Sequence, residues 1–445
     1  MRATHLARAS ILALLLTAAA PGRAELSPAE SRMAATVEAE YERSVALLAK
    51  LVNQNSGSMN AEGVKKVAEM MRAELEPLGF AVRWEDMSAT KRAGHLIATK
   101  TGKRGTKKLL LIAHLDTVFE PDSPFQTFTR KMDGGKDRGE GPGAGDNKGG
   151  LVVIVSALRA MQAAGTLKDA NIEVFMSGDE EDGGDPIEVA RASLIAAGKR
   201  ADAALDFEGL SVVDGKDMGS IARRSSNNWR LTTTGRTGHS SGIFNASAGD
   251  GAIYEMARII ARFRSELPEP NLTFNVGLMA GGQEVALDPD GIRIEAKGKT
   301  NIIPATAIAR GDFRTLSNEQ TERVMAKMKA IVAEHLPLTN AELVFDPGSY
   351  PPMAPTAGNR ALLAGLNAVN TDLGLPQMEA LDPLKRGAGD IGFVAADVDG
   401  LVGLGVDSEG DHAAGETADL DSIRRQAKRA AILMTRLSRE KSIRK

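Results

Sequence analysis

The chain contains no cysteine and few aromatic residues, and both absences narrow its possible functions. Without a thiol, the protein needs no disulfide, and no cysteine can ligate a metal ion or act as a nucleophile. Aromatic residues make up only 4% of the 445 residues, which does not favour an aromatic-rich surface for carbohydrate or single-stranded nucleic acid. Its size must therefore supply its stability, and this length predicts two or three domains.

The sequence also lacks a strong excess of positive charge and an apolar run long enough to cross a bilayer. The formal net charge is −3, so we expect no nucleic-acid partner. The apolar run Ile11–Ala20 is too short to span a membrane, follows Arg2 and Arg8, and precedes small residues up to Ala24. This pattern is typical of a signal peptide. We expect cleavage after Ala24 and a periplasmic or secreted mature chain without a membrane segment; a membrane-anchoring N-terminus is the alternative.

Apolar periodicity predicts a discontinuous α/β fold. Residues 25–220 begin with two helical stretches and continue with short apolar strands that alternate with helices. This order favours a largely parallel sheet. Residues 221–348 instead read as strand, helix, strand, strand, helix, strand, the ferredoxin-like βαββαβ order. The α/β character returns over residues 349–445. We therefore expect an α/β domain interrupted by a small inserted domain.

Acidic residues and histidines cluster where the predicted strands end. In open α/β sheets, the carboxyl ends of the strands are where ligands bind. Imidazole and carboxylate groups without sulfur suit Zn²⁺, with Mn²⁺ and Co²⁺ as alternatives. The residues at these strand ends are His114, Asp116, Asp146, Asp179, Glu180, Glu181, Asp206, Glu208 and His412.

Each of these stretches has a simpler interpretation when taken alone. His114 could be a hydrogen-bonded histidine at a strand end, and the acidic "GDEEDGGD" could be a solvated loop. The glycine-rich "GEGPGAGDNKGG" could cradle a phosphate, but it lacks the spacing and the GK[ST] ending of a P-loop. The metal-site hypothesis rests on the whole set, because chance seldom puts such groups at successive strand ends.

Seven motifs, in order along the chain, give the sequence a resemblance to a known family. They are "HLDTV", "GPGAGDNKGG", "DEE", "LDFEG", "GHSSG", "NIIPATAIARGDFR" and "DHAAGE". With these motifs the chain resembles the M20 family of co-catalytic zinc peptidases, and within it the glutamate carboxypeptidase (carboxypeptidase G2-like) branch. The resemblance implies two Zn²⁺ ions per subunit. It also implies that the inserted domain is a lid and dimerisation domain.

The resemblance assigns the metal ligands residue by residue. His114 and Glu208 would hold one zinc, His412 and Glu181 the other, and Asp146 would bridge both. Asp206 is a reserve ligand, because it lies two residues before Glu208 on the same strand face.

The resemblance also implies the catalytic groups. Glu180 would transfer protons, and Asp116 would hydrogen-bond the second ring nitrogen of His114 and fix its tautomer. His239 would reach the active site of a partner subunit and stabilise the oxyanion. The peptide bond from Asp146 to Asn147 would be cis.

The expected substrate-binding residues are Asn301, Arg314, Arg386 and Gly387. Arg314 would pair with a substrate carboxylate. The substrate loop reads "RGAGDIG", whereas the family pattern is "GGTDA"-like, so Arg386 and Ala388 replace glycines. Arg386 would either add positive charge to the pocket or narrow it.

These residues together predict a dinuclear zinc-dependent carboxypeptidase that removes a C-terminal glutamate-like residue from a small peptide or N-acyl amino acid. A homodimer through the inserted domain is expected as well. An N-acyl-amino-acid deacylase or a dipeptidase on the same metal centre is the alternative, and a non-catalytic periplasmic binding protein is a remote one. His95 and His335 lie outside the motifs and are expected to be structural.

Overall fold

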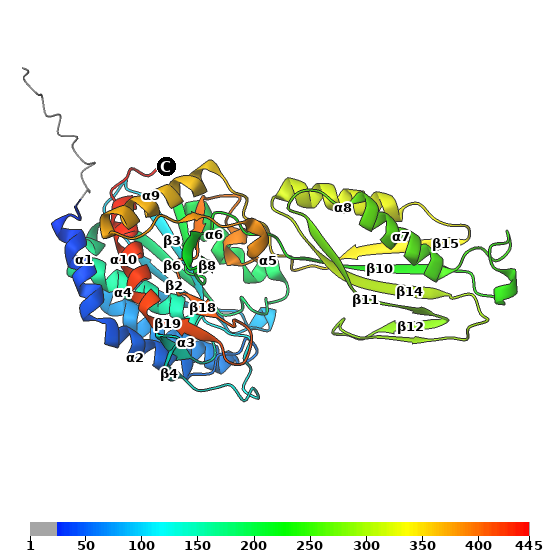
Figure 1. The fold of residues 1–445 in the computed structure, drawn as a ribbon, viewed down its shortest axis with the longest axis horizontal. Coiled ribbons are helices and arrows are strands. Elements are labelled where there is room, and N and C mark those ends of the chain that lie inside the picture. The colour runs from blue at the N-terminus through cyan, green and yellow to red at the C-terminus, as the bar shows by residue number, and fades with distance from the viewer. Residues whose placement is uncertain (1–24, 445) are drawn as a thin grey trace, which may run out of the picture.

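The computed structural model describes residues 25–444, so the predicted signal peptide lies outside the described residues. Within that range no helix combines the length and the apolar character needed to cross a membrane. The chain forms an α/β domain and an inserted domain, which extend side by side in Figure 1. The fold class predicted from the sequence is confirmed.

A six-stranded sheet forms the centre of the α/β domain. Its order is β1-β2-β6-β3-β7-β17; the strands from β6 to β17 run parallel, whereas β1 and β2 are antiparallel at one edge. The sheet is therefore parallel where the predicted ligands follow its strands. The strands are β1 (Ala81–Asp86), β2 (Gly94–Lys100), β3 (Lys108–His114), β6 (Asn171–Ser177), β7 (Ala203–Asp206) and β17 (Gly400–Val402).

Helices cover both faces of this sheet, because its central strands are apolar on both sides. In β3, Leu109 and Leu111 belong to one core, while Leu110 and Ile112 belong to the other. The larger core lies under α1 (Pro28–Ala39), α2 (Tyr41–Val52), α3 (Ala61–Leu75), α4 (Lys148–Ala163), α9 (Ala357–Leu373) and α10 (Leu420–Leu437). The smaller core lies under α6 (Ala192–Arg200), which follows the short α5 (Ile187–Ala190).

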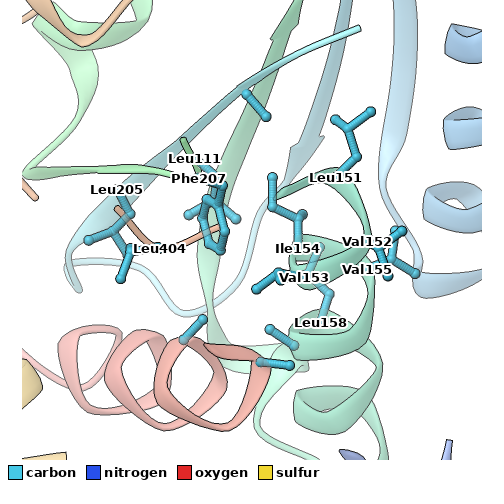
Figure 2. Packing of buried hydrophobic residues seen from close by; sticks show 14 of the residues in the cluster. Leu111, Leu151, Val152, Val153, Ile154, Val155, Leu158, Leu205, Phe207 and Leu404 are labelled. Atoms are coloured by element: carbon cyan, nitrogen blue, oxygen red, sulfur yellow. The ribbon is translucent and has the colours of Figure 1, made fainter. Parts of the chain in front are cut away.

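The helix α4 shows how the sequence sets this packing. Leu151, Ile154 and Leu158 recur at helical spacing and belong to the same core as Leu111 and Phe207 (Figure 2). All five side chains are completely buried. Because α4 begins directly after the predicted bridging residue, this packing fixes the position of the loop that precedes it.

The first helical stretch differs from the single helix that its periodicity suggests. Ser27 begins α1 with a capping box: its hydroxyl accepts from the Glu30 amide at 3.4 Å, and the Glu30 carboxylate accepts from the Ser27 amide at 2.8 Å. The stretch then breaks at Glu40, whose carboxylate forms two hydrogen bonds, of 2.6 and 2.7 Å, with Arg159 of α4. The break lets α1 and α2 both pack against α4.

The inserted domain has the predicted βαββαβ order. Its antiparallel sheet, β11-β14-β10-β15, packs one face against the two helices around a separate core that contains Trp229, Phe263 and Phe313. The elements are β10 (Asn227–Gly235), α7 (Ala252–Glu266), β11 (Thr273–Gly282), β14 (Thr306–Arg314), α8 (Asn318–Val332) and β15 (Thr339–Phe345). An additional hairpin, β12 (Glu284–Leu287) and β13 (Ile294–Lys297), lies between β11 and β14 in sequence.

Two backbone segments connect the domains and pair with each other. The Arg223 amide donates to the Met353 carbonyl at 3.0 Å, and the Ser226 amide donates to the Tyr350 carbonyl at 3.0 Å; both bonds are reciprocated. We call residues 223–226 and 350–353 the hinge ribbon. The two segments are therefore held to each other where the chain enters and leaves the inserted domain.

Candidate metal centre

The five predicted metal ligands come together in two groups that share one aspartate. Each residue offers a nitrogen or oxygen atom, and within each group these atoms lie within 4.8 Å of one another. Asp206, the reserve ligand, belongs to neither group. The groups are His114, Asp146 and Glu208, and Asp146, Glu181 and His412.

The first group forms where two neighbouring parallel strands end. His114 is the last residue of β3, and Glu208 follows β7, which pairs with β3. His114 Nε2 lies 2.8 Å from Asp146 Oδ1 and 3.3 Å from Glu208 Oε1. The His114 ring is almost completely buried, so this position is shielded from solvent.

The second group draws its histidine from a different sheet. His412 was expected at the end of an apolar strand, but that strand, β17, ends at Val402. His412 instead lies in the turn between β18 (Ser408–Glu409) and β19 (Thr417–Asp419). Its Nε2 is 3.1 Å from Asp146 Oδ2 and 3.2 Å from Glu181 Oε2, and its side chain is 54% exposed. This position is therefore open to solvent.

The shared Asp146 is held by a buried glutamate to which the sequence analysis gave no role. Glu416 Oε1 accepts from the amides of Gly145 at 2.7 Å and Asp146 at 2.9 Å, and its Oε2 accepts from the Gly143 amide at 3.2 Å. The peptide bond between Asp146 and Asn147 is cis, as the resemblance implied. Glu416 is the last residue of the motif "DHAAGE". The motif therefore pointed to this residue, but the sequence does not show that its carboxylate holds the Asp146 loop.

Asp116 joins the first histidine to the loop that follows β6. His114 Nδ1 lies 3.1 Å from the Asp116 carbonyl and 3.4 Å from its carboxylate Oδ1. The same carboxylate accepts from the Ser58 hydroxyl at 2.6 Å and from the amides of Glu180 and Glu181 at 3.1 Å each. Burial raises the pKa of Asp116, but the hydrogen bond and charge of His114 outweigh it, and the pKa lies below its ordinary value. Asp116 therefore orients both the His114 imidazole and the backbone of Glu180 and Glu181.

Glu180 adjoins both groups without belonging to either. Burial, and next the negative charge of Glu208, raise the pKa of Glu180 well above its ordinary value. Its backbone is fixed on both sides: its amide donates to Asp116, and its carbonyl accepts from the Tyr350 hydroxyl at 2.8 Å. A carboxyl group with a raised pKa beside a metal site is suited to accept and return a proton.

Comparison with known proteins places this geometry in a family. The sequence pattern of peptidase family M20/M25/M40 matches residues 110–436. The chain belongs to this family. Carboxypeptidase G2 of Pseudomonas sp. (strain RS-16) is 29% identical over 327 residues, which cover 72% of each chain. A succinyl-diaminopimelate desuccinylase of Acidovorax ebreus is 24% identical over 60% of this chain and 68% of its own.

Solved M20 structures share the fold. The M20 metallo-carboxypeptidase Sso-CP2 of Sulfolobus solfataricus has a TM-score of 0.61 at 18% identity and covers 89% of this chain and 99% of its own. Aminopeptidase PepT of Bacillus cereus has a TM-score of 0.70 at 20% identity, with 90% and 99% covered. The protein is therefore an M20 metallopeptidase, a hydrolase, with an α/β domain and an inserted βαββαβ domain.

Two arginines adjoin Glu208 in this M20 peptidase, and a third lies at the predicted substrate loop. Arg223 Nη1 pairs with Glu208 Oε2 at 3.0 Å, which leaves Oε1 toward His114. Arg386 donates to the Gly209 carbonyl at 2.6 Å and lies 3.9 Å from Glu208 Oε2. Burial and the charge of Asp146 raise the pKa of Glu208. The charges of Arg223 and His114 outweigh them and lower this pKa to about 2. Arg223 had no role in the sequence analysis.

The inserted domain contributes the third arginine, at the predicted substrate loop. Arg314 ends β14, and its Nη1 would lie 3.6 Å from a β-carbon placed on Gly387. It pairs with Asp312 at 3.3 Å and remains about one-third exposed. The structure thus brings Arg314, Arg386 and Gly387 together at the junction of the two domains.

The remaining predicted residues lie elsewhere. His239 and Asn301 are exposed and adjoin each other, because the Ser240 amide donates to the Asn301 carbonyl at 2.9 Å. His239 follows the end of β10, and Asn301 precedes the start of β14, which pairs with that end; the hinge ribbon adjoins the opposite end of β10, so one chain does not bring these residues to its own metal centre. His95 bonds the Ala190 carbonyl at 2.8 Å, and His335 contacts a glutamate of α7 at 3.4 Å; neither belongs to a metal group.

The donor set fits a pair of divalent cations. Glu181 Oε1 is buried and has no hydrogen-bond partner among the described residues, although its companion Oε2 faces His412. A buried carboxylate oxygen without a partner is costly unless a cation or a proton satisfies it. Imidazole nitrogen and carboxylate oxygen are ligands that Zn²⁺ accepts.

Proposed function

We propose that this M20 peptidase is a dinuclear zinc-dependent carboxypeptidase that hydrolyses the amide bond to a C-terminal glutamate-like residue. The observation that carries the proposal is the pair of imidazole–carboxylate groups sharing Asp146, with Glu180 beside them. Carboxypeptidase G2, the relative that covers 72% of this chain, supports the reaction type.

The chain's own residues divide the work of binding the cations. His114 and Glu208 would hold one cation, His412 and Glu181 the other, and Asp146 both. When bound, the two cations supply Lewis-acid polarisation of the scissile carbonyl and activation of a water molecule. Asp116 keeps the His114 Nδ1 proton directed at itself, so that Nε2 carries the lone pair needed for ligation.

Glu180 provides the proton path. Its carboxyl takes a proton from the attacking water and gives it to the amine that leaves. The burial that raises its pKa favours the protonated form after the first transfer. Glu180→Gln keeps the size of the side chain but removes the base.

Arg314 and Arg386 support recognition of an acidic released residue. Both guanidinium groups lie at the substrate loop, and each can donate paired hydrogen bonds to a carboxylate. Arg386 Nε is buried and has no hydrogen-bond partner among the described residues, so it has a donor left for a ligand. A C-terminal glutamate offers two carboxylates for two arginines.

A deacylase that acts on N-acyl amino acids is the second candidate. The relatives named succinyl-diaminopimelate desuccinylase favour it, because they match 60% of this chain or more. It would use the same metal residues and Glu180, and would differ in which part of the substrate faces the two arginines.

We also propose a homodimer through the inserted domain. Its α7 exposes Ile253 and Tyr254, its edge strand β11 exposes Met279, and a groove of about 820 Å³ lies beside them. Ser240, next to His239, also lines this groove. A second copy seated here would cover apolar surface and a strand edge, and would put its own residues near the exposed His239.

The deciding experiment is hydrolysis of an N-acyl-amino-acid panel by the chain that begins after Ala24. The panel varies the released residue (glutamate, alanine, phenylalanine) and the acyl group (4-aminobenzoyl, succinyl), with chelated and zinc-restored samples. We expect zinc-dependent release with glutamate preferred. Glu180→Gln should lose about 10²–10⁴-fold in kcat, whereas Glu188→Gln, an exposed glutamate on nearby α5, should not.

Other outcomes of the panel redirect the proposal. Preference set by a succinyl acyl group would favour the deacylase. Failure to turn over any substrate with Zn²⁺, Mn²⁺ or Co²⁺ would contradict the hydrolase mechanism at this centre and favour the binding-protein alternative.

We propose export as well, on the pattern of residues 1–24 alone. N-terminal sequencing of the protein recovered from the periplasmic fraction should begin at Glu25. An intact N-terminus in the membrane fraction would contradict cleavage.

A further inference from the structure

The hinge ribbon directs one side chain from each of its segments into the metal centre. Arg223, on the first segment, bonds Glu208. Tyr350, on the second, donates its hydroxyl to the Glu180 carbonyl at 2.8 Å. Since the two segments are hydrogen-bonded to each other, the residues that connect the domains also touch a ligand residue and the proton-transfer residue.

The Tyr350 hydroxyl is fixed in direction by a second bond. It accepts from Arg191 Nη2 at 3.0 Å, so its own proton is free to point at the Glu180 carbonyl. The ring packs edge-on against Phe393, with centroids 5.0 Å apart and planes at 67°. The phenol is therefore held between Arg191, Phe393 and the loop that carries Glu180.

Arg191 explains why this arrangement is rigid. It is fully buried, and it bonds Asp179 Oδ1 at 2.6 Å and Asp390 Oδ1 at 2.7 Å. Asp179 directly precedes Glu180, and Asp390 lies within the substrate loop. A buried guanidinium with both partners satisfied keeps one geometry, because breaking either contact leaves a charge unpaired.

We propose that Tyr350 is a positioning residue: it holds the Glu180 backbone in place and links that position to the hinge ribbon. The inference rests on the proposed role of Glu180. The Glu180 peptide has two anchors, the Asp116 carboxylate on its amide and the Tyr350 hydroxyl on its carbonyl. With one anchor gone, the carboxyl group samples positions from which proton transfer is slower, because catalytic rates fall steeply with small displacements.

The test compares Tyr350→Phe with Tyr41→Phe. Each removes one hydroxyl, but Tyr41 bonds Asp137, and neither of these two residues belongs to the metal groups. For Tyr350→Phe on the preferred substrate of the panel, we expect kcat to fall about tenfold, the equivalent of one hydrogen bond, with KM and zinc content unchanged. Tyr41→Phe should keep the wild-type kcat.

Hydrogen exchange of residues 178–184 provides a readout that does not depend on activity. In Tyr350→Phe, the amides of this segment should exchange faster, because the loop has lost an anchor, and in Tyr41→Phe they should not. Wild-type kcat together with wild-type exchange would overturn the proposal, and so would a lowered Tm without a change in either. If the wild-type enzyme turns over nothing, the proposed function fails while the exchange experiment still decides the positioning.

The link to the hinge ribbon is tested by a double-mutant cycle. Pro351→Gly frees the backbone next to Tyr350, and we expect it to speed exchange of residues 178–184 about tenfold when Tyr350 is present. In the Tyr350→Phe background the same change should have little further effect, because the connection is already cut. Equal effects in both backgrounds would overturn the link.

Discussion

Replacing Glu416 by glutamine should weaken metal binding without touching any predicted ligand. The Glu416 carboxylate accepts three backbone amides from the loop that ends at Asp146, at 2.7, 2.9 and 3.2 Å. The amide side chain of Glu416→Gln has one oxygen and one NH₂ group. If the oxygen faces Gly145 and Asp146, the NH₂ group faces the Gly143 amide, and two donors oppose each other.

The magnitude follows from these contacts. Burial raises the pKa of Glu416 to about 7, so the carboxylate is charged above that pH. There a hydrogen bond to a charged group contributes about 1.5–3 kcal/mol, and the substitution loses one bond and the charge on the other two. Part of the lost hydrogen-bond free energy appears as disorder of the loop in the free protein. A bound cation recovers part of it when it orders Asp146. We therefore expect the zinc affinity to fall about 10–100-fold, which corresponds to about 1.4–2.8 kcal/mol.

Chelator competition with metal-free protein measures this affinity directly. The matched control is Glu409→Gln, seven residues earlier in the same segment, where a 65% exposed glutamate pairs with Arg138. The control should bind zinc as the wild type does. Equal affinities for Glu416→Gln and Glu409→Gln would refute the idea that the loop anchor supports the metal.

Three further changes test other parts of the structure. Asp217→Asn leaves the buried Arg429 without its carboxylate and should lower the free energy of unfolding by about 3–5 kcal/mol at pH 7. Burial raises the pKa of Asp217, but the neighbouring arginines outweigh it, so its pKa in the folded protein lies below the ordinary value. The contribution of Asp217 to the free energy of unfolding is therefore complete above the unfolded pKa of about 3.9 and is lost as the pH falls through the folded pKa. In urea titrations, the wild type and the variant should therefore converge in acid. Arg386→Gly should raise KM on the order of tenfold for a glutamate substrate and less for an alanine substrate in steady-state assays, whereas an equal change for both would contradict a carboxylate contact. If the proposed dimer forms, the wild type should sediment as a dimer and Tyr254→Asp as a monomer in sedimentation equilibrium. A dimeric Tyr254→Asp would place the interface elsewhere, and a monomeric wild type would contradict the dimer.

Much of the fold could be predicted from local patterns. The apolar runs of β3 and β6 and the helical spacing of α4 follow from residues that are close in sequence, and the structure confirms the α/β fold and the βαββαβ insertion. The break at Glu40 could not be foreseen in this way. It depends on Arg159, more than a hundred residues later, and helical periodicity does not record such a partner.

The same distinction separates the site residues that were predicted from those that were not. His114, Glu181 and Glu208 follow strands, and the register of a parallel sheet brings strand ends to one edge without further information. His412 depends on a turn in a small separate sheet, so only its motif identified it.

The residues that support the ligands were missed because their chemistry does not show in sequence. Arg223, Arg191 and Tyr350 stand in stretches without a motif, and an arginine or a tyrosine in a strand is ordinary until its partners are known. Their function comes from long-range contacts: Arg191 meets Asp390 across 199 residues, and Tyr350 meets Glu180 across 170. These contacts join the two halves of the α/β domain, which the inserted domain separates in sequence. The chain passes through the hinge ribbon, beside the metal centre, both when it enters the inserted domain and when it leaves it. On the proposed positioning role of Tyr350, a movement of the inserted domain would act first on Arg223 and Tyr350, and through them on Glu208 and Glu180.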